Sequence, residues 1–175
     1  AGIRLLVEPI NTFDIPGFHL HGTAQAIALI DEVGADNLFL QHDIYHMQRM
    51  EGELANTIAA HWPRIAHMQI ADNPGRNEPG TGEINYAWLF NFIGQLGYDG
   101  WIGCEYRSRT TTSAGLDWLR RLRAPGHAFR NSLCRAHESP PCPIASLPPS
   151  APVTAWTCAF TTGRCRPTCA AAGWP

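Results

Sequence analysis

The sequence predicts an α/β fold: four βα units with parallel strands, equivalent to the C-terminal half of an eight-stranded (βα)8 barrel. Four short apolar runs alternate with four helical patterns in the order β-α-β-α-β-α-β-α, which is typical of a parallel sheet covered by helices. A complete barrel takes about 250 residues, so units that end near residue 122 correspond to half of one. The alternative is an open doubly wound sheet, but no glycine-rich phosphate-binding motif follows the first strand.

The first unit begins with a buried strand at Arg4–Ile10, which Pro9 brings to an end. Glu8 stands at the C-terminal edge of this strand. Apolar residues at helical spacing predict a helix over Thr23–Val33, and Gly34 is suited to cap its C-terminus.

The second unit has a strand at Asn37–Asp43, which again ends in a carboxylate. The pattern that follows predicts one helix over Tyr45–His61, with Pro63 just beyond its end. The third strand is Ile65–Ala71. It leads into a loop at residues 72–85 in which Pro and Gly are so frequent that neither a helix nor a strand can continue.

This loop is central to the predicted active site because it lies at the C-terminal end of a buried strand, where α/β barrels place their catalytic residues. It carries polar and charged side chains, namely Asp72, Asn73, Arg76, Glu78 and Glu83. A helix at Tyr86–Leu96, a strand at Trp101–Tyr106 and a helix at Thr112–Leu122 complete the predicted units. Trp88, Trp101 and Trp118 are expected in the core.

The composition changes abruptly near Leu122. Residues 1–122 hold 14 of the 15 acidic residues and carry a formal charge of −6, whereas residues 123–175 carry +4, nine of the 14 prolines and five of the six cysteines. We therefore predict a domain boundary here and an irregular Pro/Cys-rich tail that is disordered or non-native and shares no core with residues 1–122. A disulfide framework or a zinc site are the alternatives, but the closest pair, Cys165 and Cys169, has no matching second pair.

Charge and hydropathy exclude several classes of partner. The formal net charge is −2, which does not favour nucleic acid or an anionic membrane. The sequence contains no apolar run of 18 residues and no signal peptide, so we expect a cytoplasmic protein. It begins directly with a strand and without an initiator Met, from which we expect a chain that starts in mid-fold.

Each predicted strand delivers one oxygen ligand at or near its C-terminal end, and these ends meet on one rim of a parallel barrel. Three carboxylates and one amide oxygen form a hard site suited to Mg²⁺ or Mn²⁺. Without a cation the three carboxylates would repel one another. Ordinary roles remain open for single members, such as a helix N-cap or a satisfied core amide. The four predicted metal ligands are Glu8, Asp43, Gln69 and Glu105.

Two further residues are predicted to contact the substrate. His46 follows Asp43 by three residues, so it should lie in the first turn of a helix and face the same rim, although a surface histidine is the simpler alternative. Arg76 lies on the 72–85 loop, where a guanidinium could bind a substrate carboxylate bidentately. The alternative for Arg76 is a salt bridge that braces the loop, to Glu78 or Glu83.

Five segments of the sequence together resemble the hydroxypyruvate isomerases, which belong to the xylose-isomerase-like TIM barrels. The resemblance covers about residues 3–122 and corresponds to the C-terminal half of that barrel, so the first four βα units are missing and the tail departs from the family. Related ketose epimerases are similar but usually have His where this chain has Gln69. The segments that carry the resemblance are Leu-Leu-Val-Glu-Pro-Ile-Asn, Asp-Ile-Tyr-His-Met-Gln, His-Met-Gln-Ile-Ala-Asp-Asn-Pro-Gly-Arg, Glu-Pro-Gly-Thr-Gly-Glu-Ile-Asn-Tyr and Gly-Tyr-Asp-Gly-Trp-Ile-Gly-Cys-Glu-Tyr.

The resemblance implies that Glu8 and Glu105 are the paired acid/base carboxylates and that all four ligands bind the divalent metal. It implies isomerisation of hydroxypyruvate, a small hydroxy-keto acid, to 2-hydroxy-3-oxopropanoate (tartronate semialdehyde) through an enediolate, with no nucleotide cofactor. The alternatives are a sugar or ketose epimerase and a catalytically inactive fragment. Half a barrel leaves two unpaired strand edges, Arg4–Ile10 and Trp101–Tyr106, which favour homo-oligomerisation or aggregation.

Overall fold

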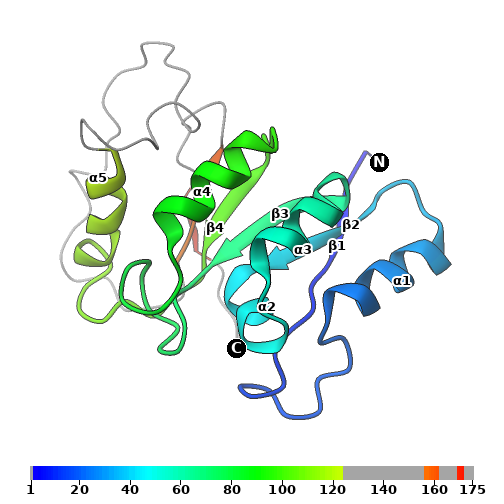
Figure 1. The fold of residues 1–175 in the computed structure, drawn as a ribbon, viewed down its shortest axis with the longest axis horizontal. Helices are drawn as coiled ribbons and strands as arrows, with labels where there is room; N and C mark the ends of the chain where they lie inside the picture. Colours follow the sequence, from blue (N-terminus) through cyan, green and yellow to red (C-terminus); the bar gives the residue numbers. More distant parts are fainter. Residues whose placement is uncertain (1, 124–155, 162–168, 172–175) are drawn as a thin grey trace.

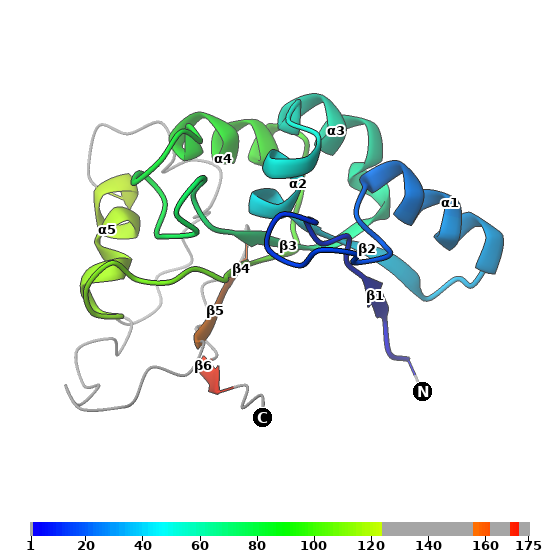
Figure 2. The same ribbon diagram turned by 90° about the horizontal axis from the view of Figure 1, so that it is seen from below.

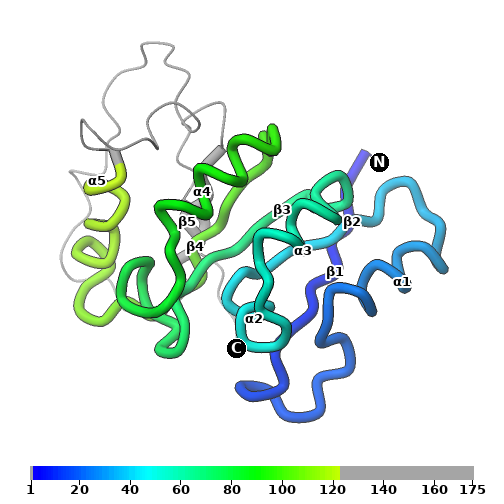
Figure 3. Tube along the Cα trace, in the orientation of Figure 1, coloured from blue at the N-terminus to red at the C-terminus, as the bar shows by residue number. Residues whose placement is uncertain are grey.

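The computed structural model describes residues 2–123, 156–161 and 169–171. Within these residues one sheet runs in the order β1-β2-β3-β4-β5-β6, and Figure 1 shows its first four strands. The first four strands are parallel and adjacent in chain order, as the path of the chain in Figure 3 also shows. The strands are β1 (Leu5–Val7), β2 (Leu38–Asp43), β3 (Ile65–Ile70), β4 (Trp101–Cys104), β5 (Trp156–Thr161) and β6 (Cys169–Ala171).

The helices α1, α3 and α4 lie on one side of the four parallel strands, as the edge-on view in Figure 2 shows. No helix in the described part of the chain is long and apolar enough to cross a membrane. The helical segments are α1 (Thr23–Val33), α2 (Ile44–Met50), α3 (Leu54–His61), η1 (Trp62–Arg64), α4 (Tyr86–Gln95), η2 (Ala114–Leu116) and α5 (Asp117–Arg123).

The four parallel strands alternating with helices confirm the predicted fold class. Because these strands run in the same direction, their C-terminal ends lie along one edge of the sheet. This edge receives Glu8 after β1, Asp43 at the end of β2 and Glu105 after β4.

The two faces of the sheet differ in burial. Side chains that alternate toward the helices are almost fully buried, including Leu40, Met68 and Ile102. On the opposite, inner face, Gln41 pairs in register with His67, which pairs with Trp101, and all three are only partly buried. The helices therefore build a core on one face and leave polar groups accessible on the other.

The helix predicted over Tyr45–His61 is interrupted, which corrects that prediction. The structure has two helices, α2 and α3, separated by Glu51, Gly52 and Glu53. Gly52 has φ 63° and Glu53 has φ 48°, so the backbone turns through the left-handed region and cannot continue a right-handed helix. Apolar residues at helical spacing continue across residues 51–53, so the pattern does not reveal that the helix is interrupted there.

One tryptophan also departs from the prediction. Trp118 is buried, with 4% of its surface exposed, but Trp88 is 54% exposed. Trp88 stacks on Phe92 along the outer side of α4, with ring centroids 5.3 Å apart. Leu89 and Phe90 face the core instead.

The tail contains two strands that the sequence analysis did not predict. β5 pairs antiparallel with β4, with Ile102 opposite Phe160, and β6 pairs antiparallel with β5. The tail was predicted to be irregular, and these two short strands, at 156–161 and 169–171, were not placed in it; through them the edge of β4, which was expected to be unpaired, is paired. Edge strands expose unpaired N–H and C=O groups, which an extended segment can satisfy. The other predictions for the tail lie outside the described residues, and the domain boundary stays a prediction.

Candidate metal centre and active site

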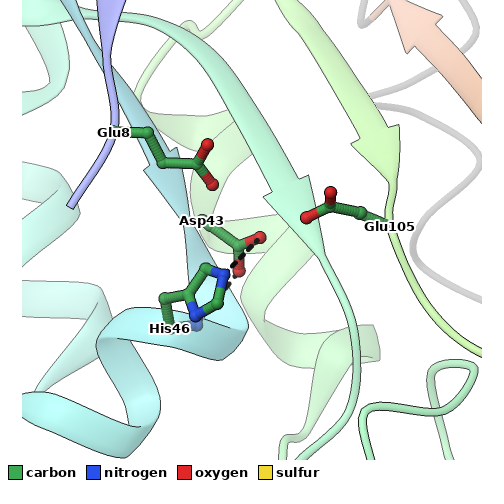
Figure 4. Close-up of side chains that lie close together, drawn as sticks. All are labelled: Glu8, Asp43, His46 and Glu105. Atoms are coloured by element: carbon green, nitrogen blue, oxygen red, sulfur yellow. Dashed lines mark hydrogen bonds and ion pairs between the residues drawn. The ribbon is translucent and has the colours of Figure 1, made fainter. Parts of the chain in front are cut away.

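Glu8 reaches the site directly after β1, on the inner face of the sheet (Figure 4). Its two carboxylate oxygens have different environments. Oε2 accepts a hydrogen bond from the side-chain amide of Gln41 at 2.7 Å, whereas the buried Oε1 has no hydrogen-bond partner among the described residues. An unpaired buried oxygen of this kind is costly unless another group binds it.

Asp43 ends β2 and is fully buried. Its Oδ1 accepts the backbone N–H of His46 at 3.0 Å and so caps α2, as one alternative from the sequence proposed. The second oxygen, Oδ2, is buried and has no hydrogen-bond partner in the part of the chain that the structure describes. The cap therefore orients the carboxylate but leaves half of it available.

Glu105 follows β4, and its backbone N–H donates to the carbonyl of Ile70 at 3.0 Å. Its carboxylate faces the other acids across the sheet edge (Figure 4). Arg76 Nη2 lies 2.9 Å from Glu105 Oε2 and forms an ion pair with it. Glu105 is thus the acid of the group with a permanent cationic partner among the described residues.

The ligand atoms of four residues, one from each, all lie within 4.8 Å of one another: Glu8, Asp43, His46 and Glu105. Three carboxylates so close together repel each other unless protons or a cation neutralise them. The two buried, unpartnered oxygens belong to this same group. The donor set and its unsatisfied atoms therefore fit a hard divalent cation.

Gln69 lies beside Asp43, its register partner on the neighbouring strand. Its Oε1 accepts from Gln41 Nε2 at 2.5 Å, and the same nitrogen donates to Glu8. The structure thus links Gln69 to the acid group through Gln41. Glycine at position 103 leaves room here, because a Cβ there would lie 3.0 Å from His67 Nε2 and 3.5 Å from Gln69 Cγ.

His46 is held by Asn11, which lies in the loop after β1. The backbone N–H of Asn11 points at His46 Nδ1 at 3.3 Å, and Asn11 Nδ2 lies 2.6 Å from the same atom. Asp14 fixes the Asn11 amide, because its carboxylate accepts from Nδ2 and its backbone N–H donates to Oδ1. Nδ1 is therefore the acceptor of the imidazole, and Nε2 carries the hydrogen.

This tautomer separates His46 from the metal ligands. Burial lowers the pKa of His46 to about 4, with the nearby Arg76 acting in the same direction, so the ring is neutral near pH 7. Its Nε2–H lies 4.0 Å from Asp43 Oδ2 and 3.4 Å from Arg76 Nη2. A nitrogen that carries hydrogen has no lone pair for a metal, so His46 is suited to donate to a substrate oxygen.

Arg76 enters the site from the 72–85 loop with φ 53°. It does not make the loop-bracing salt bridge considered from the sequence. Glu78 accepts instead from the backbone N–H of Arg109, and Glu83 from Gln48 and Asn73. The Arg76 guanidinium packs over the Tyr45 ring and pairs with Glu105.

The electrostatics of the site favour protonated acids when no cation is bound. Burial, together with the neighbouring Asp43 and Glu105, raises the pKa of Glu8 to about 8. Burial likewise raises the pKa of Asp43, with a smaller contribution from Glu105. Perturbed carboxyls in a cluster are typical of functional sites.

Four residues of the site were missed by the sequence analysis: Gln41, Asn11, Asp14 and Tyr45. Gln41 precedes Asp43 by two residues, so strand alternation places both on the same face, a signal that was available. Asn11 and Asp14 act through a loop whose path is set by tertiary contacts. Tyr45 donates its hydroxyl to Asp14 at 2.8 Å, which sequence spacing alone does not indicate.

Comparison with known proteins supports the fold. Over 117 residues the chain is 65% identical to the hydroxypyruvate isomerase of Escherichia coli (strain K12), covering 67% of this chain and 45% of that protein. It is 51% identical over 119 residues to the 2-oxo-tetronate isomerase of Cupriavidus necator, covering 68% and 46%. The chain spans about half the length of the curated relatives it matches.

Among solved structures, the crystal structure of an AP endonuclease, family 2, from Brucella melitensis matches with a TM-score of 0.67 and 41% identity, over 70% of this chain and 48% of that one. The family model described as xylose isomerase-like TIM barrel matches residues 1–122. These residues contain all four parallel strands and every predicted site residue. The chain belongs to the xylose isomerase-like TIM barrel family.

Proposed function

We propose that this chain carries the metal-binding and acid/base residues of an isomerase that interconverts hydroxypyruvate and 2-hydroxy-3-oxopropanoate. The observation that carries the proposal is the group formed by Glu8, Asp43 and Glu105, in which two buried carboxylate oxygens lack partners. The similarity to a hydroxypyruvate isomerase supports the choice of substrate. The short distances between the ligand atoms of this group, all within 4.8 Å, support a metal-dependent reaction.

The proposed metal ligands are Glu8, Asp43, Gln69 and Glu105, with Mg²⁺ or Mn²⁺ as the ion. Their oxygen atoms suit a hard cation, and the His46 tautomer keeps that residue out of the ligand set. When bound, such an ion would polarise the carbonyl and hydroxyl oxygens of the substrate and acidify the adjacent C–H bond.

Glu8 and Glu105 are the proposed proton carriers. One carboxylate takes a proton from the hydroxyl-bearing carbon of hydroxypyruvate, and the other returns a proton to the former carbonyl carbon. The hydroxyl proton moves to the neighbouring oxygen, so atoms and charge balance and the electrons stay within the substrate. Glu8 and Glu105 come from β1 and β4, the two outer strands of the parallel set, and they face each other across the site (Figure 4).

Arg76 and His46 are proposed to bind the substrate. The Arg76 guanidinium is 22% exposed, lies beside Glu105 and can accept a second anion, the substrate carboxylate. The His46 Nε2–H can donate to a substrate oxygen at the same place. Both contacts favour a 2-oxo acid over a neutral sugar, which favours the isomerase over an epimerase.

A related substrate is the second candidate, because the chain is also 51% identical to a 2-oxo-tetronate isomerase. The same residues would act on that 2-oxo acid by the same proton transfers. Parallel assays with both compounds separate the two candidates: the better substrate has the higher kcat/KM.

We propose that activity needs a complete pocket and therefore the remaining part of the barrel, because the matched residues make up only 45% of the hydroxypyruvate isomerase they resemble. Catalysis requires a closed pocket that positions the substrate closely. We therefore expect the isolated 175-residue chain to bind the ion weakly and to isomerise hydroxypyruvate poorly or not at all. Activity at the level of a complete relative in the isolated chain would contradict this.

The test joins residues 1–122 to the N-terminal portion of the Escherichia coli relative and follows hydroxypyruvate consumption with Mg²⁺ or Mn²⁺. Glu8→Gln and Glu105→Gln should each lower kcat by about 10²–10⁴-fold, the usual worth of a positioned acid or base. Glu32→Gln, on the exposed side of α1, is the matched control and should leave kcat unchanged. An unchanged rate in both site variants would refute the assignment.

A further inference from the structure

Gln41 occupies a distinct place in the site: it is not an acid, yet it contacts two proposed metal ligands at once. Its Nε2 donates to Glu8 Oε2 at 2.7 Å and to Gln69 Oε1 at 2.5 Å. An amide nitrogen has two hydrogens, so both are used on these ligands.

Its register on the sheet explains this bridging position. Gln41 pairs with His67 on β3, and the next inner-face pair along is Asp43 with Gln69. Because side chains alternate along a strand, Gln41 lies on the same inner face as Asp43, two residues before it. From there a side chain of this length reaches both Glu8, directly after β1, and Gln69, on β3.

The bridge also fixes which atoms the ligands present. A carboxylate oxygen accepts hydrogen bonds, so Glu8 Oε2 requires the nitrogen of the Gln41 amide to face it. That same nitrogen then requires the oxygen of the Gln69 amide, rather than its nitrogen, on the near side. Glu8 is left with Oε1 as its one unpartnered oxygen.

We propose that Gln41 is a positioning residue that presets Glu8 and Gln69 as single-oxygen ligands of the divalent ion. This inference rests on the proposed function, because it assumes that the ion binds at this group. Residues that orient metal ligands in this way typically change metal affinity 10–100-fold when they are replaced. Gln41 turns its amide nitrogen toward Glu8 and Gln69, and this nitrogen is a hydrogen-bond donor rather than a metal ligand.

The test measures Mn²⁺ binding to the 175-residue chain by calorimetry or by the electron paramagnetic resonance signal of free Mn²⁺. Gln41→Met keeps the length and volume of the side chain but removes the donor, and it should weaken Mn²⁺ affinity about 10–100-fold. Gln41→Asn shortens the side chain, which withdraws the amide from both acceptors, and it should also weaken the Mn²⁺ affinity. Gln48→Met is the matched control: Gln48 lies on α2 and contacts Glu83 outside the ligand group.

A double-mutant cycle separates positioning from a general loss of structure. If Gln41 acts through Gln69 and Glu8, the effect of Gln41→Met should shrink in a Gln69→Met background, because one of its two partners is gone. Additive effects would refute positioning through Gln69. Far-UV circular dichroism of each variant shows that the fold is kept.

The outcomes also distinguish this inference from the proposed function. If the unmodified chain binds Mn²⁺ and both Gln41 variants bind it equally well, the role of Gln41 is wrong and the metal centre stands. If the unmodified chain binds no Mn²⁺ at millimolar concentration, both are overturned. If the Gln41 variants bind Mn²⁺ more weakly and the Gln48→Met control does not, the result supports both the metal centre and the role of Gln41.

Discussion

Asp43 divides its two carboxylate oxygens between structure and site. Oδ1 caps α2 and Oδ2 remains buried and unpartnered. Glu8 does the same with Oε2 on Gln41 and Oε1 free. An oxygen tied to a hydrogen-bond donor orients its partner oxygen, so each acid presents one well-placed ligand atom, while burial raises the pKa of both acids. Protons and a cation therefore compete for the unpartnered oxygens of these two acids.

That competition gives a prediction on pH. The pKa of Glu8 is about 8 in the folded chain against an ordinary value of 4.5, so the folded state holds a proton that the unfolded state releases. In the metal-free chain this contribution to stability is full below about pH 4.5 and is lost as the pH rises through 8. Cation affinity should change in the opposite direction: it should rise from pH 5 to about 8 and then level off.

Calorimetric titration with Mn²⁺ at pH 6.5, in two buffers of different ionisation enthalpy, measures the protons released on binding. We expect net proton release, and we expect Glu8→Gln to reduce it. Glu32→Gln serves again as the control. A Mn²⁺ affinity that is constant between pH 5 and 8 would show that these carboxyls are already ionised without the ion.

At the scale of elements, the 72–85 loop is organised by one buried carboxylate. Asp72 Oδ2 accepts the backbone N–H groups of Gly80, Thr81 and Gly82, and Oδ1 accepts that of Ile84. Gly82 has to be glycine, because a Cβ there would lie 2.0 Å from the carbonyl oxygen of Asn73. These contacts hold the loop in the shape that brings Arg76 to Glu105.

Replacing Asp72 should therefore loosen the loop. In Asp72→Asn an amide NH₂ meets backbone donors, and the loss of hydrogen bonds to a charged group should cost on the order of 3 kcal/mol of stability. Limited trypsin digestion with mass spectrometry should show faster cleavage after Arg76. Asp36→Asn, on an exposed turn, is the control. Equal cleavage rates in the two variants would mean that Asp72 does not hold the loop.

Elements with strong local signals were predicted well from the sequence. Thr23–Val33 has the predicted bounds because an apolar stripe and a C-terminal Gly34 agree. The α2–α3 break was missed because Glu53 has φ 48°, a left-handed conformation that glutamate does not favour and that apolar spacing does not indicate. In the site, acids at strand ends were predictable from topology. Asn11 was not, because its role depends on where a loop folds back.

At the scale of the whole molecule, the sheet is asymmetric. Helices cover one face, whereas the inner face is partly exposed and ends at β1, a free edge in the described part of the chain. Ile3, Leu5 and Leu6 on and beside this edge are 63%, 55% and 40% exposed. The opposite edge of the parallel set, β4, is paired with β5. A protein of this family with all eight strands would close both edges into a barrel.

The free edge leads to the last prediction. Unpaired backbone groups flanked by exposed apolar side chains recruit further strands, so the isolated chain should self-associate through β1. Light scattering coupled to size exclusion should show a mass that increases with concentration. Leu5→Lys places a charge on the edge and should shift the chain toward the monomer. Val33→Lys is the matched control: Val33 is also 55% exposed but lies at the C-terminal end of α1 and not on β1. A chain that is monomeric at every concentration, or that responds equally to both substitutions, would show that another surface or none governs association.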